Sequence, residues 1–190
     1  RSAGNIDVVL VAYDERGRIL DFGSLEVQAV YISGNIRRPF EKFMNDLTVT
    51  DLDWTQEKNY PRPDYLSSSR KRLAPQMIFK GGILKAWKKK QAVAIDRGFY
   101  VTLPSLKEVA KKNADIAWLV YDLKPNEQRQ AYELILHKTV YTEFDSALNQ
   151  ITTAEAGVVD DFIHHLQEKL DARLEGNSPE APILGDLILS

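Results

Sequence analysis

The chain has 190 residues, no cysteine and a formal net charge of −2, with 25 Lys or Arg against 27 Asp or Glu. That length suits one domain with a sizeable core. The absence of cysteine excludes disulfides, thiolate metal sites and cysteine nucleophiles within these residues. No run approaches the roughly 18 apolar residues of a membrane span, so we expect no membrane association. A net charge near zero would also argue against a nucleic-acid partner, but the distribution of charge along the chain leads to a different conclusion.

The N-terminal part predicts a β-hairpin. Residues 6–13 are apolar and β-branched, which is typical of a buried strand. Asp14 and Gly17 occupy the first and fourth positions of a type I turn. Residues 19–32 then predict the return strand, with a bulge at Gly23.

A long helix is expected after the hairpin. Residues 38–47 predict a short helix first, and the polar stretch 48–63 predicts a loop. Asp64 can cap the long helix, which should run to about residue 90. Pro75 and the two glycines at 81–82 predict breaks within it.

The second half predicts three strands and two helices. The strands are expected at 91–103, 116–123 and 132–141, with a short helix at 105–112. Residues 156–174 predict an amphipathic helix.

These elements together predict an α/β fold with a mixed central sheet flanked by helices. One domain is expected over residues 1–175, followed by a C-terminal tail at 176–190.

Three polar side chains interrupt the apolar pattern of the predicted hairpin. Asp7 lies at the start of the first strand, while Glu26 and Gln28 lie in the second. The two-residue period of a strand puts Glu26 and Gln28 on one face. Counting back from the turn, the simplest register leaves Asp7 one step away from the face of Glu26, so a bulge near Gly23 is needed to bring them together.

Two carboxylates that face each other in an apolar hairpin repel and are costly to bury, and a divalent cation removes that cost. Oxygen ligands without nearby Cys or His suit Mg²⁺ or Mn²⁺. Such a metal can activate a water and stabilise charge on a phosphodiester. Gln28 cannot act as a general base, but it can position water or a phosphate oxygen. The alternative is that Glu26 and Gln28 occupy the solvent face of an edge strand.

The hairpin resembles the metal-binding core of the PD-(D/E)xK nucleases, in the variant where Gln replaces the usual Lys. More narrowly, the chain resembles the NotI-type restriction endonucleases. That family combines a strand-borne Asp, a Leu-Glu-(Val/Ile)-Gln strand, a glycine-containing segment, a basic helix with a Gln-Met pair, and a buried strand that ends in an acid and a proline. The matching features here are Asp7, residues 25–28, residues 33–35, Gln76 with Met77, and residues 117–123 with Asp122 and Pro125.

The resemblance covers about residues 4–150 and implies a restriction-endonuclease-like fold. It implies that Asp7 and Glu26 bind Mg²⁺ and that Gln28 replaces the catalytic Lys. It also implies a cytoplasmic homodimer that cuts double-stranded DNA at a specific sequence. Two features depart from the family: its upstream four-cysteine iron site has no counterpart, and a helix and strand that precede the Asp would lie upstream of Arg1.

Basic residues concentrate in one segment. Residues 61–97 hold ten Lys or Arg and two acids, a net charge of +8, which is the electrostatic footprint of a DNA backbone contact. The alternative is a solvated helix with a Lys-rich C-terminal end. Arg37 and Arg38 could reach a groove edge, because Arg can bind guanine in a bidentate way. The candidate DNA contacts are Asn35, Arg37, Arg38, Arg70, Lys71, Arg72, Lys80, Lys85 and Lys88.

Two other functions stay open at this point. One is a non-catalytic DNA-binding remnant or fragment of such a nuclease, which would bind DNA with steep salt dependence and never cut it. The other is an α/β domain whose basic helix meets an acidic protein. A salt-titrated DNA-binding assay separates the second from the DNA-dependent functions.

Overall fold

The computed structural model of the chain describes residues 4–46, 53–56, 58–153 and 156–175. The chain divides into two compact units, Arg1–Thr153 and Ala154–Ser190. The second unit contributes one described element, helix α7 (Val159–Glu175), within the range where an amphipathic helix is expected. The division into a domain at 1–175 and a tail stays a prediction, and the tail itself lies outside the described residues. Among the described helices, none combines the length and apolarity that crossing a membrane requires.

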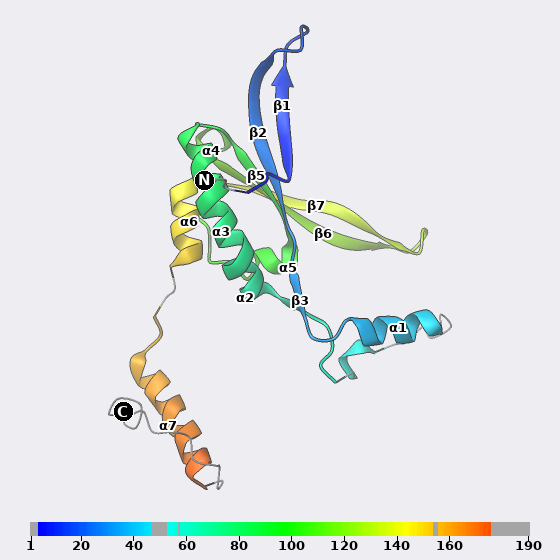
Figure 1. Cartoon of the computed structure of the whole chain (residues 1–190), viewed down its shortest axis with the longest axis vertical. Helices are drawn as coiled ribbons and strands as arrows, with labels where there is room; N and C mark the ends of the chain where they lie inside the picture. The colour runs from blue at the N-terminus through cyan, green and yellow to red at the C-terminus, as the bar shows by residue number, and fades with distance from the viewer. Residues whose placement is uncertain (1–3, 47–52, 57, 154–155, 176–190) are drawn as a thin grey trace. The chain divides into compact units, whose positions relative to one another are not determined.

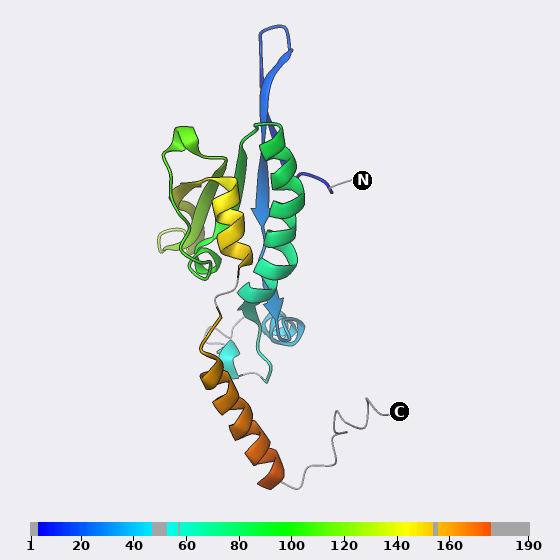
Figure 2. The same ribbon diagram turned by 90° about the vertical axis from the view of Figure 1, so that its left-hand side faces the viewer.

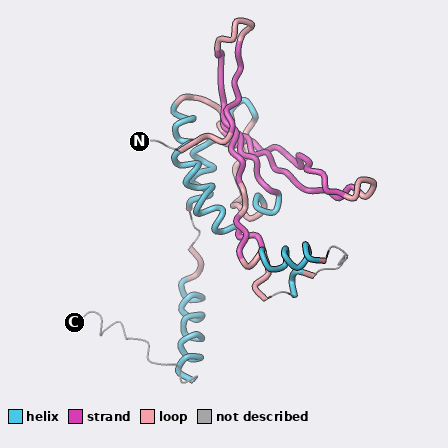
Figure 3. Tube along the Cα trace, turned by 45° about the vertical axis from the view of Figure 1, so that its right-hand side comes forward, coloured by secondary structure: helices cyan, strands magenta, loops and turns pink. Residues whose placement is uncertain are grey.

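The first unit is built on a five-stranded mixed sheet with the strand order β1-β2-β5-β6-β7. The strands are β1 (Val8–Tyr13), β2 (Ile19–Gln28), β5 (Gln91–Asp96), β6 (Ile116–Asn126) and β7 (Ala131–Thr142). The three central strands β2, β5 and β6 run parallel, and β1 and β7 pair antiparallel at the two edges. Figures 1 and 3 show the β1–β2 and β6–β7 hairpins as two arms of this sheet. The predicted mixed α/β fold is confirmed, and it is restriction-endonuclease-like.

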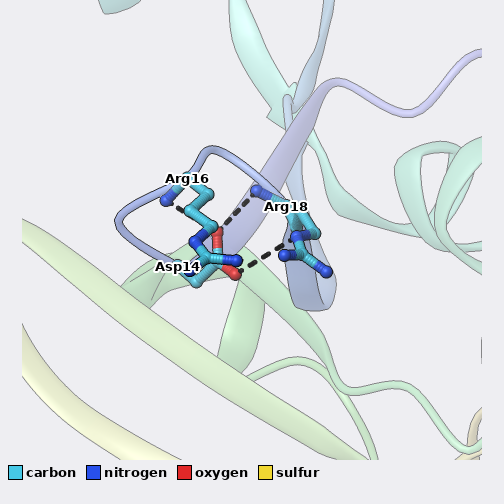
Figure 4. Close-up of polar contacts among 3 residues, drawn as sticks. All are labelled: Asp14, Arg16 and Arg18. Carbon is cyan, nitrogen blue, oxygen red and sulfur yellow. Dashed lines mark hydrogen bonds and ion pairs between the residues drawn. The ribbon is translucent and has the colours of Figure 1, made fainter.

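The turn between β1 and β2 forms where Asp14 and Gly17 predict it. The amide of Gly17 donates to the carbonyl of Asp14 at 2.9 Å, and Gly17 has a φ of +75°, which glycine adopts without strain. The carboxylate of Asp14 accepts from the amides of Arg16 and Arg18 at 2.9 and 2.8 Å, as Figure 4 shows. The side chain of Asp14 therefore stabilises the turn by accepting hydrogen bonds from the backbone amides that follow it.

The register of the hairpin shifts by one residue next to this turn. Tyr13 pairs with Ile19, but Ala12 pairs with Asp21, so Leu20 is the extra residue on β2. A one-residue shift is what the sequence requires to bring Asp7 and Glu26 together, but its expected position at Gly23 is wrong.

Gly23 has a different role. It pairs with Leu10 in the regular part of the ladder, and a Cβ at this position would lie 2.9 Å from the carbonyl oxygen of Lys90. The amide of Ser24 donates to that same carbonyl at 3.1 Å. The glycine therefore permits the close approach of β2 to the chain that enters β5.

Strand β1 is exposed along its whole length, so the expectation of a buried strand is wrong. The reason is its place at the edge of the sheet, because apolar β-branched composition favours a strand without fixing how many layers cover it. Strand β2 follows the predicted alternation: Ser24, Glu26 and Gln28 are buried, while Val27 is exposed.

One continuous helical column covers the sheet (Figures 1 and 2). It consists of α2 (Tyr65–Ser68), α3 (Ala74–Gln76) and α4 (Gly82–Ala86), joined by π-helical turns at Ser69–Leu73 and Met77–Gly81. The predicted cap is confirmed, since the carboxylate of Asp64 accepts from the amide of Ser67 at 2.9 Å.

The predicted breaks in this column are wrong. The amide of Ala74 donates to the carbonyl of Ser69, five residues back, so a π turn directly precedes Pro75 and the helix continues through it. The amide of Gly82 donates in the same way to Met77.

The core lies between the helical column and the sheet. Leu73 and Met77 from the column pack with Val93, Trp118 and other buried residues of the central strands. The indole of Trp118 donates to the hydroxyl of Thr142 at 2.9 Å, which satisfies its polar atom inside the core. Helix α6 (Phe144–Thr152), which the sequence did not predict, closes the same core through Phe144.

The connecting segments differ from expectation at three places. Within the loop expected at 48–63, the described residues form a 3₁₀ turn at Trp54–Gln56 and strand β4 (Arg62–Asp64), which pairs with β3 (Tyr31–Ser33). The strand expected at 91–103 ends at Asp96, whose carboxylate caps α5 (Arg97–Tyr100) by accepting from Phe99.

The third difference is the helix expected at 105–112. This stretch contributes an isolated bridge at Glu108 and part of a 3₁₀ turn at Lys111–Asn113 instead. The short helix expected at 38–47 forms as α1 (Arg37–Asn45), with residues 47–52 outside the described part of the chain.

Candidate active site

Glu26 lies on the core-facing side of β2, next to Val93 of β5. Its side chain is 2% exposed, which contradicts the alternative of a solvent-facing edge strand. Strand β2 has neighbours on both sides, β1 and β5, so its buried face receives helix cover as well. A carboxylate in this environment requires a positive partner, because burial of an isolated charge is very costly.

Asp7 lies one residue before β1, at the end of the hairpin remote from its turn. Val8 pairs with Leu25, and continuing the same register places Asp7 opposite Glu26. The carboxylate of Asp7 accepts from the amide of Val27 at 2.9 Å, so it is fixed to the backbone directly after Glu26. Asp7 itself is exposed. The hairpin therefore brings an accessible carboxylate and a buried one to the same end of β2.

Gln28 shares the buried face with Glu26. Its amide nitrogen donates to the carbonyl of Ala29 at 2.8 Å, which leaves its oxygen as an acceptor. Four buried side-chain oxygens in the described part of the chain have no hydrogen-bond partner, and they belong to Ser24, Glu26, Gln28 and Gln91. Ser24 pairs with Gln91 across β2 and β5, so these oxygens form one polar strip under the helical column. Unsatisfied buried acceptors of this kind are uncommon and indicate a site that receives a cation or water.

Lys80 provides the positive charge at this strip. Its ammonium nitrogen lies 2.6 Å from Oε2 of Glu26, and its side chain is 10% exposed. Lys80 belongs to the second π-helical turn of the column, 54 residues away in sequence. Its sequence-based assignment as a DNA contact is untested, and its observed partner is the buried carboxylate.

The role of Lys80 at this site was missed in the sequence, although a signal was present. The buried apolar residues Leu73, Met77 and Leu84 follow the spacing of one helix face, and Lys80 falls on that face between them. A charged residue on the core-facing stripe of a helix requires a buried partner, and Glu26 is the acid placed to supply it.

The other basic residues of the column and of the short segment 87–90 that follows it divide into two groups. Three lysines bond within the chain: Lys85 pairs with Asp145, Lys89 pairs with Asp21, and Lys90 donates to the carbonyl of Ala114. Lys89 also lowers the pKa of Asp21 through its hydrogen bond and its charge.

The second group is exposed and consists of Arg70, Lys71, Arg72 and Lys88. Arg72 lies over the ring of Tyr31, 4.3 Å from its centroid. No ion pair involves Arg70 or Lys88 among the residues that the structure describes. The exposed cations therefore lie on the first turns of the column and at its C-terminal end.

The candidate contacts after β3 lie at the start of α1. The carboxamide oxygen of Asn35 accepts from the amide of Arg38 at 3.2 Å, so its side chain supports the helix start. Arg37 pairs with Glu41 one turn further on, at 2.6 Å. Both arginines are exposed, which leaves this helix end accessible.

Asp122 of β6, one of the residues that carry the family resemblance, pairs with Arg97 at 2.7 Å. The hydrogen bond from Arg97 lowers the pKa of Asp122, because it favours the charged form of the carboxylate. This pair ties α5 to the sheet and lies apart from the polar strip in sequence and strand position.

No group of three or more acidic, His or Cys side chains that could hold a metal is present among the described residues. A cation at the polar strip would therefore take two carboxylates, with water or substrate oxygens completing its shell. That is the usual situation for Mg²⁺, which keeps several waters and binds through one or two carboxylates.

The hairpin, the parallel crossover through the helical column and the polar strip at the end of β2 define a restriction-endonuclease-like α/β protein. The profile of the family described as Restriction endonuclease NotI matches residues 1–134. The chain belongs to this family, whose members are endonucleases of restriction systems and act on DNA. Among curated proteins, none matches this chain.

Proposed function

We propose that the protein is a Mg²⁺-dependent type II restriction endonuclease that hydrolyses duplex DNA at a specific sequence. One observation carries this proposal: the hairpin register puts Asp7 opposite Glu26, beside buried oxygens that have no protein partner in the described chain. The proposal includes a PD-(D/E)xK-type site, with Asp7 and Glu26 as metal ligands and Gln28 in the position of the usual Lys.

The residues fit a hard divalent cation. Oε1 of Glu26 and the oxygen of Gln28 are unpaired acceptors in the described structure, and Asp7 is accessible beside them. A bound Mg²⁺ would polarise the phosphate and lower the pKa of a bound water. Gln28 is fixed through its side-chain amide nitrogen, so its oxygen is free to accept a hydrogen bond from the attacking water and to position it. In the reaction, the water oxygen bonds to phosphorus while the bond from phosphorus to the leaving sugar oxygen breaks. The attacking water loses its proton to solvent, and the leaving sugar oxygen takes up a proton from solvent.

Exposed cations supply the DNA contact in this proposal. Arg70, Lys71 and Arg72 form one basic turn of the column and Lys88 lies at its other end, so they can neutralise phosphates along one helix. Arg37 and Arg38 are accessible for a groove contact. A homodimer would present two such sites to the two strands of a palindromic sequence, as two-fold symmetry requires. The cytoplasm, where the cell would meet foreign DNA, is the proposed location.

The test is metal-dependent cleavage by the complete protein. Long DNA that offers many sequences is incubated with Mg²⁺ or with a chelator, and discrete fragments are expected with Mg²⁺ alone. Glu26→Gln keeps the size of the side chain and removes its charge, so cleavage should fall by at least about 100-fold. Asp21→Asn removes an exposed carboxylate from the same strand and serves as the matched control.

Three results would contradict the proposal. Cleavage by Glu26→Gln at the wild-type rate would exclude the metal site. Salt-sensitive DNA binding without cleavage by the wild-type protein would favour the non-catalytic remnant. Weak, salt-insensitive binding would favour an acidic protein partner.

A further inference from the structure

Lys80 brings a positive charge to the buried carboxylate of Glu26. The strand segment Glu26–Gln28 does not itself carry such a charge. Its ammonium contacts Oε2 of Glu26 at 2.6 Å, while the strand position two residues on holds the neutral Gln28. Met77 and Leu84 on either side of Lys80 in the helix are 1% exposed, so the lysine stem enters the site through the core. The site therefore contains a cation that comes from the helical column.

Stability alone is a poor explanation for this pair. Replacing a buried ion pair by apolar residues of similar size is often neutral or stabilising, because both charges must be desolvated. Within the described structure, no protein group donates to the surrounding oxygens of Ser24, Glu26, Gln28 and Gln91, so acceptors gather around the ion pair. A network optimised for folding would satisfy these groups.

The ammonium of Lys80 has more hydrogen-bond donors than its contact with Glu26 uses. A Lys ammonium has three N–H donors. In the described structure, the ammonium nitrogen of Lys80 donates one hydrogen bond, to the carboxylate of Glu26. The remaining donors can bind oxygens that arrive beside Glu26, and a phosphate brings such oxygens.

The backbone around Lys80 has an unusual form. Lys80 lies in the π-helical turn Met77–Gly81, and single π turns within α-helices occur frequently at functional sites. Gly81 follows directly, and a Cβ there would lie 2.5 Å from Phe144 and 2.9 Å from Gln91. The helix is therefore held close to the polar strip at the residue that carries the ammonium.

We infer that Lys80 is a catalytic residue of the nuclease, whose ammonium contacts the scissile phosphate and stabilises the negative charge that develops on it. This inference rests on the proposed function. The ammonium of Lys80 forms no covalent bond with the phosphate, so its contribution is electrostatic. It occupies the chemical role that Gln28 leaves open, because a neutral carboxamide cannot balance an anionic phosphate.

The experiment compares neutral variants of Lys80 in the complete protein. Lys80→Met and Lys80→Gln should both lower the single-turnover cleavage rate by about 100-fold or more while DNA affinity changes by less than about threefold. Lys80→Gln keeps a hydrogen-bond donor for Glu26, so it provides a folded variant if Lys80→Met unfolds. Lys112→Met removes the same charge from an exposed turn and is the control. Thermal melting establishes that each variant is folded.

A relocated lysine gives the readout that a structural role would not produce. The double variant Gln28→Lys with Lys80→Met returns an ammonium to the strand, and its cleavage rate should exceed that of Lys80→Met by at least about tenfold. A folded Lys80→Gln protein that cleaves within about threefold of wild type would overturn the inference. So would a relocated lysine that restores melting temperature without restoring cleavage.

The outcomes separate the two proposals. If wild-type protein shows no Mg²⁺-dependent cleavage, or Glu26→Gln retains it, the proposed function fails. If wild type cleaves, Glu26→Gln does not, and Lys80→Gln cleaves normally, the role of Lys80 alone fails.

Discussion

Two neighbouring glycines of the helical column should respond in opposite directions to the same substitution. Replacing Gly by Ala inside a helix stabilises it by about 0.8–1 kcal/mol, because alanine loses less backbone entropy. At Gly82 a Cβ meets no atom within 4 Å, so Gly82→Ala should gain about that amount.

At Gly81 the added methyl group meets two side chains. It would lie 2.5 Å from Cε2 of Phe144 and 2.9 Å from Oε1 of Gln91, which are 5% and 3% exposed and cannot swing into solvent. Overpacking of this kind costs about 1–3 kcal/mol. The steric cost therefore offsets or exceeds the propensity gain, and Gly81→Ala should be neutral or destabilising by up to about 2 kcal/mol.

The assay is urea unfolding of both variants beside the wild-type protein, followed by circular dichroism. The two variants should differ by about 1–3 kcal/mol in free energy of unfolding, or roughly 2–12 °C in melting temperature for a chain of this size. A Gly81→Ala protein as stable as Gly82→Ala would refute the close packing between the column, α6 and β5.

Further perturbations test the proposed DNA contact, the core and the helix cap. Arg70→Ala should lower affinity for all DNA sequences alike and reduce the slope of log K against log salt by about 0.9; an unchanged slope in an anisotropy titration would mean that Arg70 meets no phosphate. Phe99→Ala should cost about 3–5 kcal/mol in urea unfolding because its ring is fully buried. Val101→Ala, 69% exposed, should change by less than about 0.5 kcal/mol, and equal losses would contradict the burial. The amide of Ser67 lowers the pKa of Asp64 below its ordinary 3.8, so the cap stabilises the fold above that pH and loses its effect as pH falls through the lowered value. The destabilisation by Asp64→Ala should therefore shrink in acid, and a constant loss down to pH 2 would exclude the charged cap.

Local patterns in the sequence predicted most of the sheet. The turn at Asp14 and Gly17 and the alternation that puts Glu26 and Gln28 on one face of the strand depend on neighbouring residues only, so they are visible in the chain itself. The helix break predicted at Pro75 is wrong because the π turn before this residue accommodates the proline within a continuous helix. No local propensity signals such a π turn.

The long-range part of the site could not be predicted in the same way. The ion pair of Lys80 and Glu26 joins residues 54 positions apart, and its formation depends on how the column crosses the sheet. The exposure of β1 likewise depends on which elements cover the hairpin, a tertiary property that composition does not contain.

The extra residue near the tip of the β1–β2 hairpin sets the register of the carboxylate pair at its far end. Since side chains alternate across a sheet, the register of the two strands decides whether Asp7 and Glu26 share a side. If the strands paired without the shift, Ala12 would lie opposite Leu20 and Asp7 opposite Leu25, on the other side of the sheet. The extra residue near the turn therefore sets the alignment of the two acids at the far end of the hairpin, although it contacts neither of them in the strand pairing.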